Sequence, residues 1–172
     1  MKKENYLIIL LLIFTSLSAC KKDDLTYVDD FEKSHKAWNN FKTTANNSYS
    51  YTVETSSWTG TSTTTVLTIA KGKVVKRSYV ARLRDYATNQ VTILEEWTEE
   101  GATLHTHQQG DAIITLDEVY QKARTEWLLT RVNAKTYFEA NNGGLISSAG
   151  YVENNCQDDC FVGIKISSIQ KL

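Results

Sequence analysis

The chain lacks proline entirely and carries only three cysteines among its 172 residues. About eight prolines would be average for this length, so polyproline linkers are excluded and a second domain on a stiff hinge is disfavoured. An excess of basic charge is also missing, because 19 Lys and Arg residues stand against 20 Asp and Glu residues. A nucleic-acid partner is therefore not expected.

The apolar stretch near the N-terminus, residues 6–14, is too short to span a bilayer, because a spanning helix needs about 20 apolar residues. The stretch follows Lys2 and Lys3 and precedes small and polar residues, an order typical of an export signal. We therefore predict a signal peptide over residues 1–19.

The letters LSAC at residues 17–20 close this segment and resemble the lipobox of bacterial lipoproteins. The resemblance implies that Cys20 carries acyl chains, palmitate among them, and becomes the first residue of the mature protein. Two or more chains hold a protein stably on a membrane, whereas one chain holds it marginally. The following charges, KKDD, resemble the export signals of Bacteroidota surface lipoproteins. This implies an outer-membrane lipoprotein with residues 20–28 as a charged tether, and leaves the surface and periplasmic faces both open.

The two remaining cysteines, Cys156 and Cys160, lie in the sequence CQDDC. An exported chain meets an oxidising compartment, which favours a disulfide. A redox pair is less favoured, because Asp158 and Asp159 oppose the thiolate form that such a pair needs. A metal site would usually recruit further Cys or His residues nearby. We expect a structural disulfide.

Two helices are predicted from apolar residues that recur every three or four positions, at residues 29–46 and 116–128. Thr115 and Glu118 form a capping box in front of the second helix. Alternation of apolar and polar residues predicts the strands. We place the first at residues 49–54, and a Thr-rich second strand ends at residue 69. Further strands are expected at residues 74–83, 91–97, 103–108, 135–140, 145–152 and 161–169.

This element order predicts one α+β domain over residues 29–172. Each half consists of a helix followed by an antiparallel meander, so we expect a sheet of seven or eight strands with both helices on one face. The two halves could pair edge to edge.

Three segments, AWNNF…SYSYTVE…VLTIAKGKVV, TLDEVYQKA and the final hairpin, resemble a family of uncharacterised bacterial lipoproteins that is defined by a domain of unknown function. In that family a Trp-bearing helix precedes a Tyr-x-Tyr strand and a Gly-Lys-Val hairpin. The resemblance covers residues 31–169 and implies a fold but no activity.

His105 and His107 are weak candidates for a metal site. On a strand over residues 103–108 their side chains would share one face, and imidazoles in that arrangement suit zinc or copper. Two ligands alone do not complete a site, and an exposed polar face is the alternative.

Trp58 is a candidate ligand contact, because SSWTG places it at the tip of the first predicted hairpin. Aromatic rings on loops stack on sugars or anchor protein partners. The alternative is a ring folded back over the sheet edge. The basic letters KGKVVKR at residues 71–77 could form a basic patch, but we interpret them as a solvated edge.

No catalytic set is recognisable, so we predict neither an enzyme nor a cofactor. No serine has the flanking glycines of a nucleophile elbow, and no glycine loop suits a phosphate. The leading hypothesis is a lipid-anchored binding module with a glycan or protein partner. The alternatives are a metal-binding protein or metal-dependent enzyme that uses His105 and His107, and a proteinaceous inhibitor or envelope-assembly factor.

Overall fold

The computed structural model describes residues 25–158 and 160–172. The predicted signal peptide, the lipidation site Cys20 and residues 21–24 lie outside the described residues. The first described residues already belong to the fold: Leu25 forms a β-bridge with Leu129, and Thr26 donates its N–H and its hydroxyl to the Leu128 carbonyl at 2.8 and 2.7 Å. Leu25, the first of these residues, follows Cys20 by five positions in the sequence.

Two helices form where the periodicity predicts them. The first, α2, spans Val28–Thr44. The second, α3, spans Leu116–Lys122 and continues as one π-helical turn, η2, over Ala123–Trp127. The Glu118 N–H donates to Thr115 Oγ1 at 3.3 Å, and the Thr115 N–H donates to the Glu118 carboxylate at 2.7 Å. This confirms the capping box. Across the described residues, no helix combines the length and apolarity that a membrane span requires.

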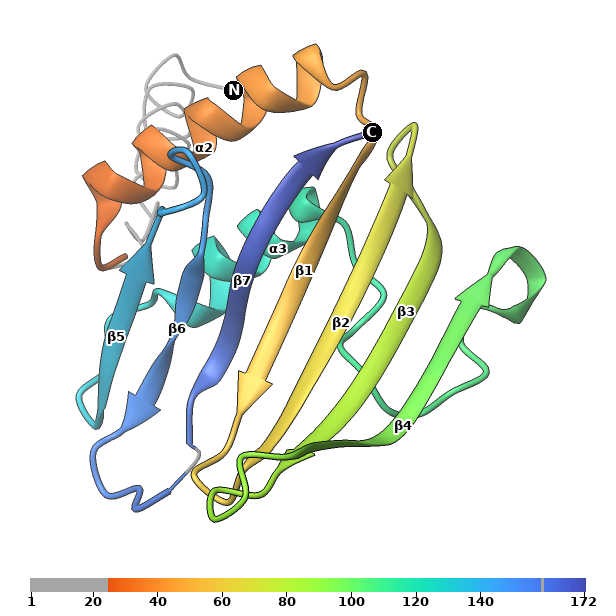
Figure 1. The fold of residues 1–172 in the computed structure, drawn as a ribbon. Helices are drawn as coiled ribbons and strands as arrows, with labels where there is room; N and C mark the ends of the chain where they lie inside the picture. The colour runs from red at the N-terminus through yellow and green to blue at the C-terminus, as the bar shows by residue number, and fades with distance from the viewer. Residues whose placement is uncertain (1–24, 159) are drawn as a thin grey trace, which may run out of the picture.

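Seven strands form one antiparallel sheet in the order β4-β3-β2-β1-β7-β6-β5, which confirms the predicted α+β class (Figure 1). Their bounds are β1 Tyr49–Ser56, β2 Thr61–Ala70, β3 Lys73–Arg84, β4 Val91–Glu100, β5 Ala134–Glu139, β6 Ser148–Glu153 and β7 Val162–Lys171. The two meanders meet edge to edge, because β1 pairs with β7 from Tyr49↔Lys171 to Val53↔Ile166.

The predicted strand at residues 103–108 is wrong. A single 3₁₀ turn, η1, spans Gly101–Thr103 and leads into a loop. His105 has a positive φ of 73°, which no strand residue adopts. The reason is a buried carboxylate: Glu99 accepts the backbone N–H groups of His105 and His107, so these groups are not available to a neighbouring strand.

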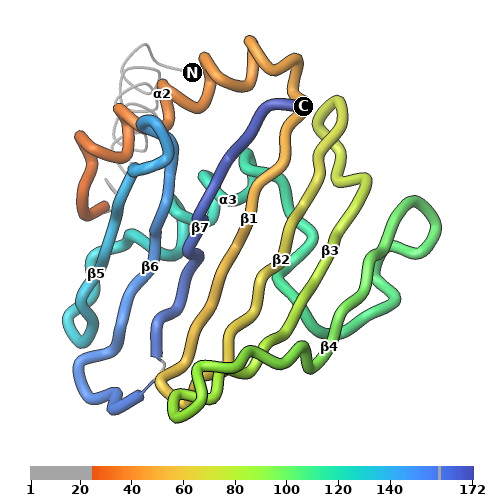
Figure 2. The backbone as a smooth tube through the Cα atoms, viewed as in Figure 1, coloured from red at the N-terminus to blue at the C-terminus, as the bar shows by residue number. Residues whose placement is uncertain are grey.

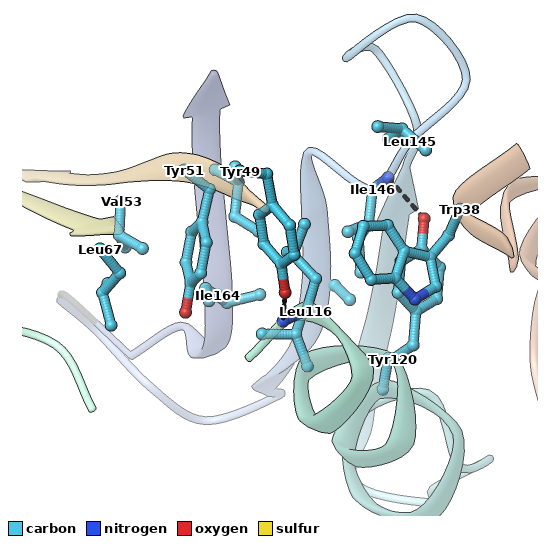
Figure 3. Packing of buried hydrophobic residues seen from close by; sticks show 14 of the residues in the cluster. Trp38, Tyr49, Tyr51, Val53, Leu67, Leu116, Tyr120, Leu145, Ile146 and Ile164 are labelled. Atoms are coloured by element: carbon cyan, nitrogen blue, oxygen red, sulfur yellow. Dashed lines mark hydrogen bonds between the residues drawn. The ribbon is translucent and has the colours of Figure 1, made fainter. Parts of the chain in front are cut away.

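The apolar core lies between the sheet and the two helices (Figure 3). Trp38 of α2 is fully buried, stacks on Tyr120 with ring centres 6.0 Å apart, and meets Tyr49 edge-on at 5.1 Å. The hydroxyls of the two tyrosines accept backbone N–H groups, Tyr49 from Leu116 at 2.9 Å and Tyr120 from Ile146 at 3.0 Å. The aromatic rings thus fix α3 to the sheet through both packing and hydrogen bonds.

Candidate functional site

His105 and His107 lie in the loop after η1, so the strand on which they were expected to share a face does not form. The His107 ring stacks on Trp97 with centres 4.2 Å apart, and its Nδ1 lies 3.1 Å from Glu99 Oε1. His105 instead contributes its backbone N–H to Glu99. Within residues 25–158 and 160–172, no three side chains of His, Cys, Asp or Glu converge in a way that could hold a metal ion.

Arg77 is buried, so the interpretation of KGKVVKR as a solvated edge is wrong at this residue. The Arg77 side chain is only 5 % exposed and Glu99 is not exposed at all. Arg77 Nε donates to Glu99 Oε2 at 3.0 Å, its other nitrogens donate to the Asp111 and His107 carbonyls, and the guanidinium lies 4.8 Å from the Trp97 ring centre. Arg77, Trp97, Glu99 and His107 form what we call the polar cluster.

Glu99 is charged at neutral pH. Burial alone would raise the pKa of this carboxyl, but hydrogen bonds from His107, His105 and Arg77 outweigh burial and lower the pKa to about 2. The same carboxylate also accepts the Thr106 hydroxyl. Because five donors surround its two oxygens, Glu99 has little capacity left to act as a base. The polar cluster therefore holds the loop after β4 against the sheet.

The outer face of the sheet, turned away from α3 and towards the viewer in Figure 1, carries a groove. The groove consists of three adjoining hollows of about 340, 450 and 630 Å³, and Lys165 lines all of them. Volumes of this order are typical of ligand pockets. The first hollow opens where β1 and β7 stop pairing, beyond Val53↔Ile166. It reaches through this gap to the inner face, because the core residue Ile164 and the loop residue Asp111 also line it. The lining of the groove includes Glu54, Tyr137, Glu139, Phe161 and Lys165.

Two aromatic rings, Tyr137 and Phe161, form an aromatic platform in the groove. Gly150 makes this arrangement possible: it pairs with Tyr137 on one side and Gly163 on the other, and a Cβ at Gly150 would lie 2.8 Å from Phe161 Cε2. The Phe161 ring therefore lies directly over bare backbone. Lys165 Nζ lies 5.0 Å from the centre of this ring. Sequence reasoning missed the platform, because it depends on the register of β5, β6 and β7.

Cys156 and Cys160 lie in the loop that leads to Phe161, as the position of CQDDC predicts. Their sulfur atoms are paired and their Cα atoms are 6.1 Å apart, a separation compatible with a disulfide. The cross-link would restrict the segment directly before Phe161.

Trp58 lies at the end of the groove and is 73 % exposed, so its ring is not folded back over the sheet. The residues on both sides of this tip, Ser57 and Thr61, line the first hollow. Trp58 therefore lies beside the groove. The aromatic rings inside the groove belong to Tyr137 on β5 and to Phe161, directly before β7.

Comparison with known protein families, with curated proteins and with solved structures finds no significant match. The resemblance to lipoproteins therefore stays a prediction.

Proposed function

We propose that the protein is a lipid-anchored binding module of the bacterial cell envelope and that the outer-face groove binds a neutral carbohydrate. The aromatic platform is the observation that carries this proposal, because apolar sugar faces stack on aromatic rings. Hydroxyl, amide and carboxylate groups border the platform, among them Ser148, Asn141 and Glu139. These groups suit the donors and acceptors of sugar hydroxyls.

The charge of the groove favours a neutral ligand. Three acidic residues and one lysine line the groove: Glu54, Asp111, Glu139 and Lys165. A second lysine, Lys135, lies beside the platform with its Nζ 5.2 Å from the Tyr137 ring centre. Charges of both signs are therefore interspersed along the groove, so neither a strongly anionic nor a strongly cationic ligand is favoured.

The ligand test is a saccharide array probed with the whole chain purified from bacterial membranes in detergent. For any saccharide that is retained, Tyr137→Ala and Phe161→Ala should each weaken binding about tenfold, because a stacking contact of this kind contributes up to about 1.5 kcal/mol. Tyr86→Ala removes an exposed ring outside the groove and should leave binding unchanged. Equal losses in all three variants, or turnover of a glycoside without stable binding, would contradict the proposal.

The anchor test is separate. With four residues between Cys20 and Leu25, the chain can span at most about 18 Å, so acylation of Cys20 would keep the domain close to the membrane surface. Cys20→Ser should move the protein from the membrane to the soluble fraction or leave the precursor unprocessed. The double variant Cys156→Ser, Cys160→Ser should remain with the membrane. A Cys20→Ser protein that still fractionates with membranes would exclude the anchor.

A further inference from the structure

The hairpin between β3 and β4 projects beyond the part of the sheet that the helices and loops cover. We call residues 83–94 the β3–β4 arm. Every residue in it is exposed, although the strands stay paired as far as Arg84↔Val91. Antiparallel strands in a folded domain usually bury one face, so an arm that is exposed on both faces lacks a packing partner among the residues that the structure describes.

The arm is apolar in spite of its exposure. Tyr86 is 67 % exposed and Ile93 is 56 % exposed, and Leu83, Val91 and Leu94 are also largely accessible. Arg84 N–H donates to the Gly60 carbonyl at 2.9 Å, so the arm is held beside the β1–β2 turn at the same end of the sheet (Figure 2). Five exposed apolar side chains within one twelve-residue hairpin are uncommon on a protein without a partner.

The backbone of β4 is open along the same surface, because β4 is the last strand of the sheet. Apart from its pairing with β3, the described chain provides hydrogen bonds to the backbone of β4 only at Glu100, which bonds to the Thr103 hydroxyl. The opposite edge strand is better protected: β5 has six residues against ten in β4, and the Tyr27 hydroxyl donates to its Thr136 carbonyl. Long open edges accept a further strand.

We propose that β4 binds an extended segment of another protein as an eighth, antiparallel strand, and that this segment carries basic residues followed by apolar ones. The charge of β4 identifies the occupant. The strand reads VTILEEWTEE and has no basic residue. Glu99 is buried against Arg77, so the charge that a partner can reach comes from Glu95, Glu96 and Glu100. An antiparallel partner places its first residues opposite the glutamate-rich end of β4 and its last residues opposite Val91 and Ile93.

The same charges disfavour a second copy of this chain. Antiparallel pairing of two β4 strands over their full length would set Glu95 of one copy opposite Glu96 of the other, and like charges in opposite positions destabilise a sheet. The proposal is independent of the carbohydrate groove, which lies on other strands.

The probe is a capped peptide of sequence KTKTKTVTV, added to the whole chain in detergent. Hydrogen–deuterium exchange should show amides of residues 91–98 exchanging about tenfold more slowly with this peptide, because half of them gain a carbonyl partner. The acidic peptide ETETETVTV and the reversed peptide VTVTKTKTK should give no such protection. Raising the salt concentration should weaken the effect, because exposed charges are screened.

Two variants separate this surface from the rest of the molecule. Ile93→Lys should abolish the protection while leaving the melting temperature unchanged, since Ile93 is exposed. Tyr137→Ala, in the groove, should keep the protection. The proposal is overturned by absence of protection with about 1 mM basic peptide, by equal protection with the acidic peptide, or by β4 amides that are already protected in a dimer without peptide.

Discussion

The inner face of the sheet is covered by helices over one half and by a loop over the other, and the buried residues differ accordingly. Under α2 and α3 the contacts are aromatic and aliphatic, with Trp38 and Tyr120 at the centre. Under the loop after β4, a charged pair, Arg77 and Glu99, is buried instead. A helix satisfies its own backbone groups, whereas a loop brings unpaired N–H groups that need acceptors when buried. Glu99 supplies such an acceptor for His105 and His107.

The largest effect is expected in the helix-covered half. Trp38→Ala removes a fully buried ring and the hydrogen bond from its Nε1 to Asp117 Oδ1. The free energy of unfolding, measured by urea titration, should fall by about 4 kcal/mol. The control Trp58→Ala should change it by less than about 0.5 kcal/mol, because Trp58 is exposed. Equal losses in the two variants would contradict the position of the core.

A smaller loss is expected in the loop-covered half. Arg77→Met leaves the buried Glu99 without its cation, and removing one partner of such a pair costs about 3 kcal/mol. Arg84→Met on the same strand is the matched control, since residue 84 is exposed. If urea titration shows the same small change for both variants, the polar cluster does not stabilise the fold.

The buried carboxylate of the loop-covered half should make the stability of the protein depend on acid pH. The pKa of Glu99 is depressed to about 2, below the usual value of about 4.3. The carboxylate therefore contributes stability that is fully present above about pH 4.5 and is lost as the pH falls towards 2. Asp111 acts in the opposite direction, because burial raises its pKa.

A series of urea midpoints between pH 5 and pH 2 measures this contribution. Glu99→Gln should be less stable at pH 5 and should show a flatter profile than the wild type. Glu100→Gln, an exposed neighbour on β4, should keep the wild-type slope. If the urea midpoint of Glu99→Gln falls with pH as steeply as that of the wild type, the acid sensitivity comes from other carboxyls.

The smallest effect returns to the helix-covered half. Thr115 Oγ1 caps α3 by accepting the Glu118 N–H. Thr115→Ala removes this cap and should lower the free energy of unfolding by about 1 kcal/mol in the same titration. Thr115→Ser keeps the hydroxyl and should lie close to the wild type. Equal losses for serine and alanine would show that the threonine methyl group, which both variants lack, matters here and the cap does not.

The helix-covered half was the more predictable one. Its helices and strands follow from periodicities of three to four and of two, which are local properties of the sequence. The Thr115 and Glu118 capping box is local as well, and it appears as predicted. The pairing of β1 with β7 was an open alternative that only the three-dimensional structure shows.

The loop-covered half and the groove depend on contacts between distant residues. The sequence HTH at residues 105–107 alternates like a strand. It forms a loop instead, because the backbone N–H groups of His105 and His107 donate to the Glu99 carboxylate. Arg77 lies two positions before the buried Tyr79 on the same face, a signal that could have indicated burial. The aromatic platform depends on Gly150 facing Tyr137 across β5 and β6, and no short sequence window contains both strands.

The position of β7 has a consequence for how the chain is made. β7 comes from residues 162–171 yet lies in the middle of the sheet, between β1 and β6. The N-terminal meander and the β5–β6 hairpin therefore cannot join until the ribosome has added these late residues. Such long-range pairing is slow to form. The sheet of a nascent polypeptide of this design therefore stays incomplete until its last strand has been synthesised.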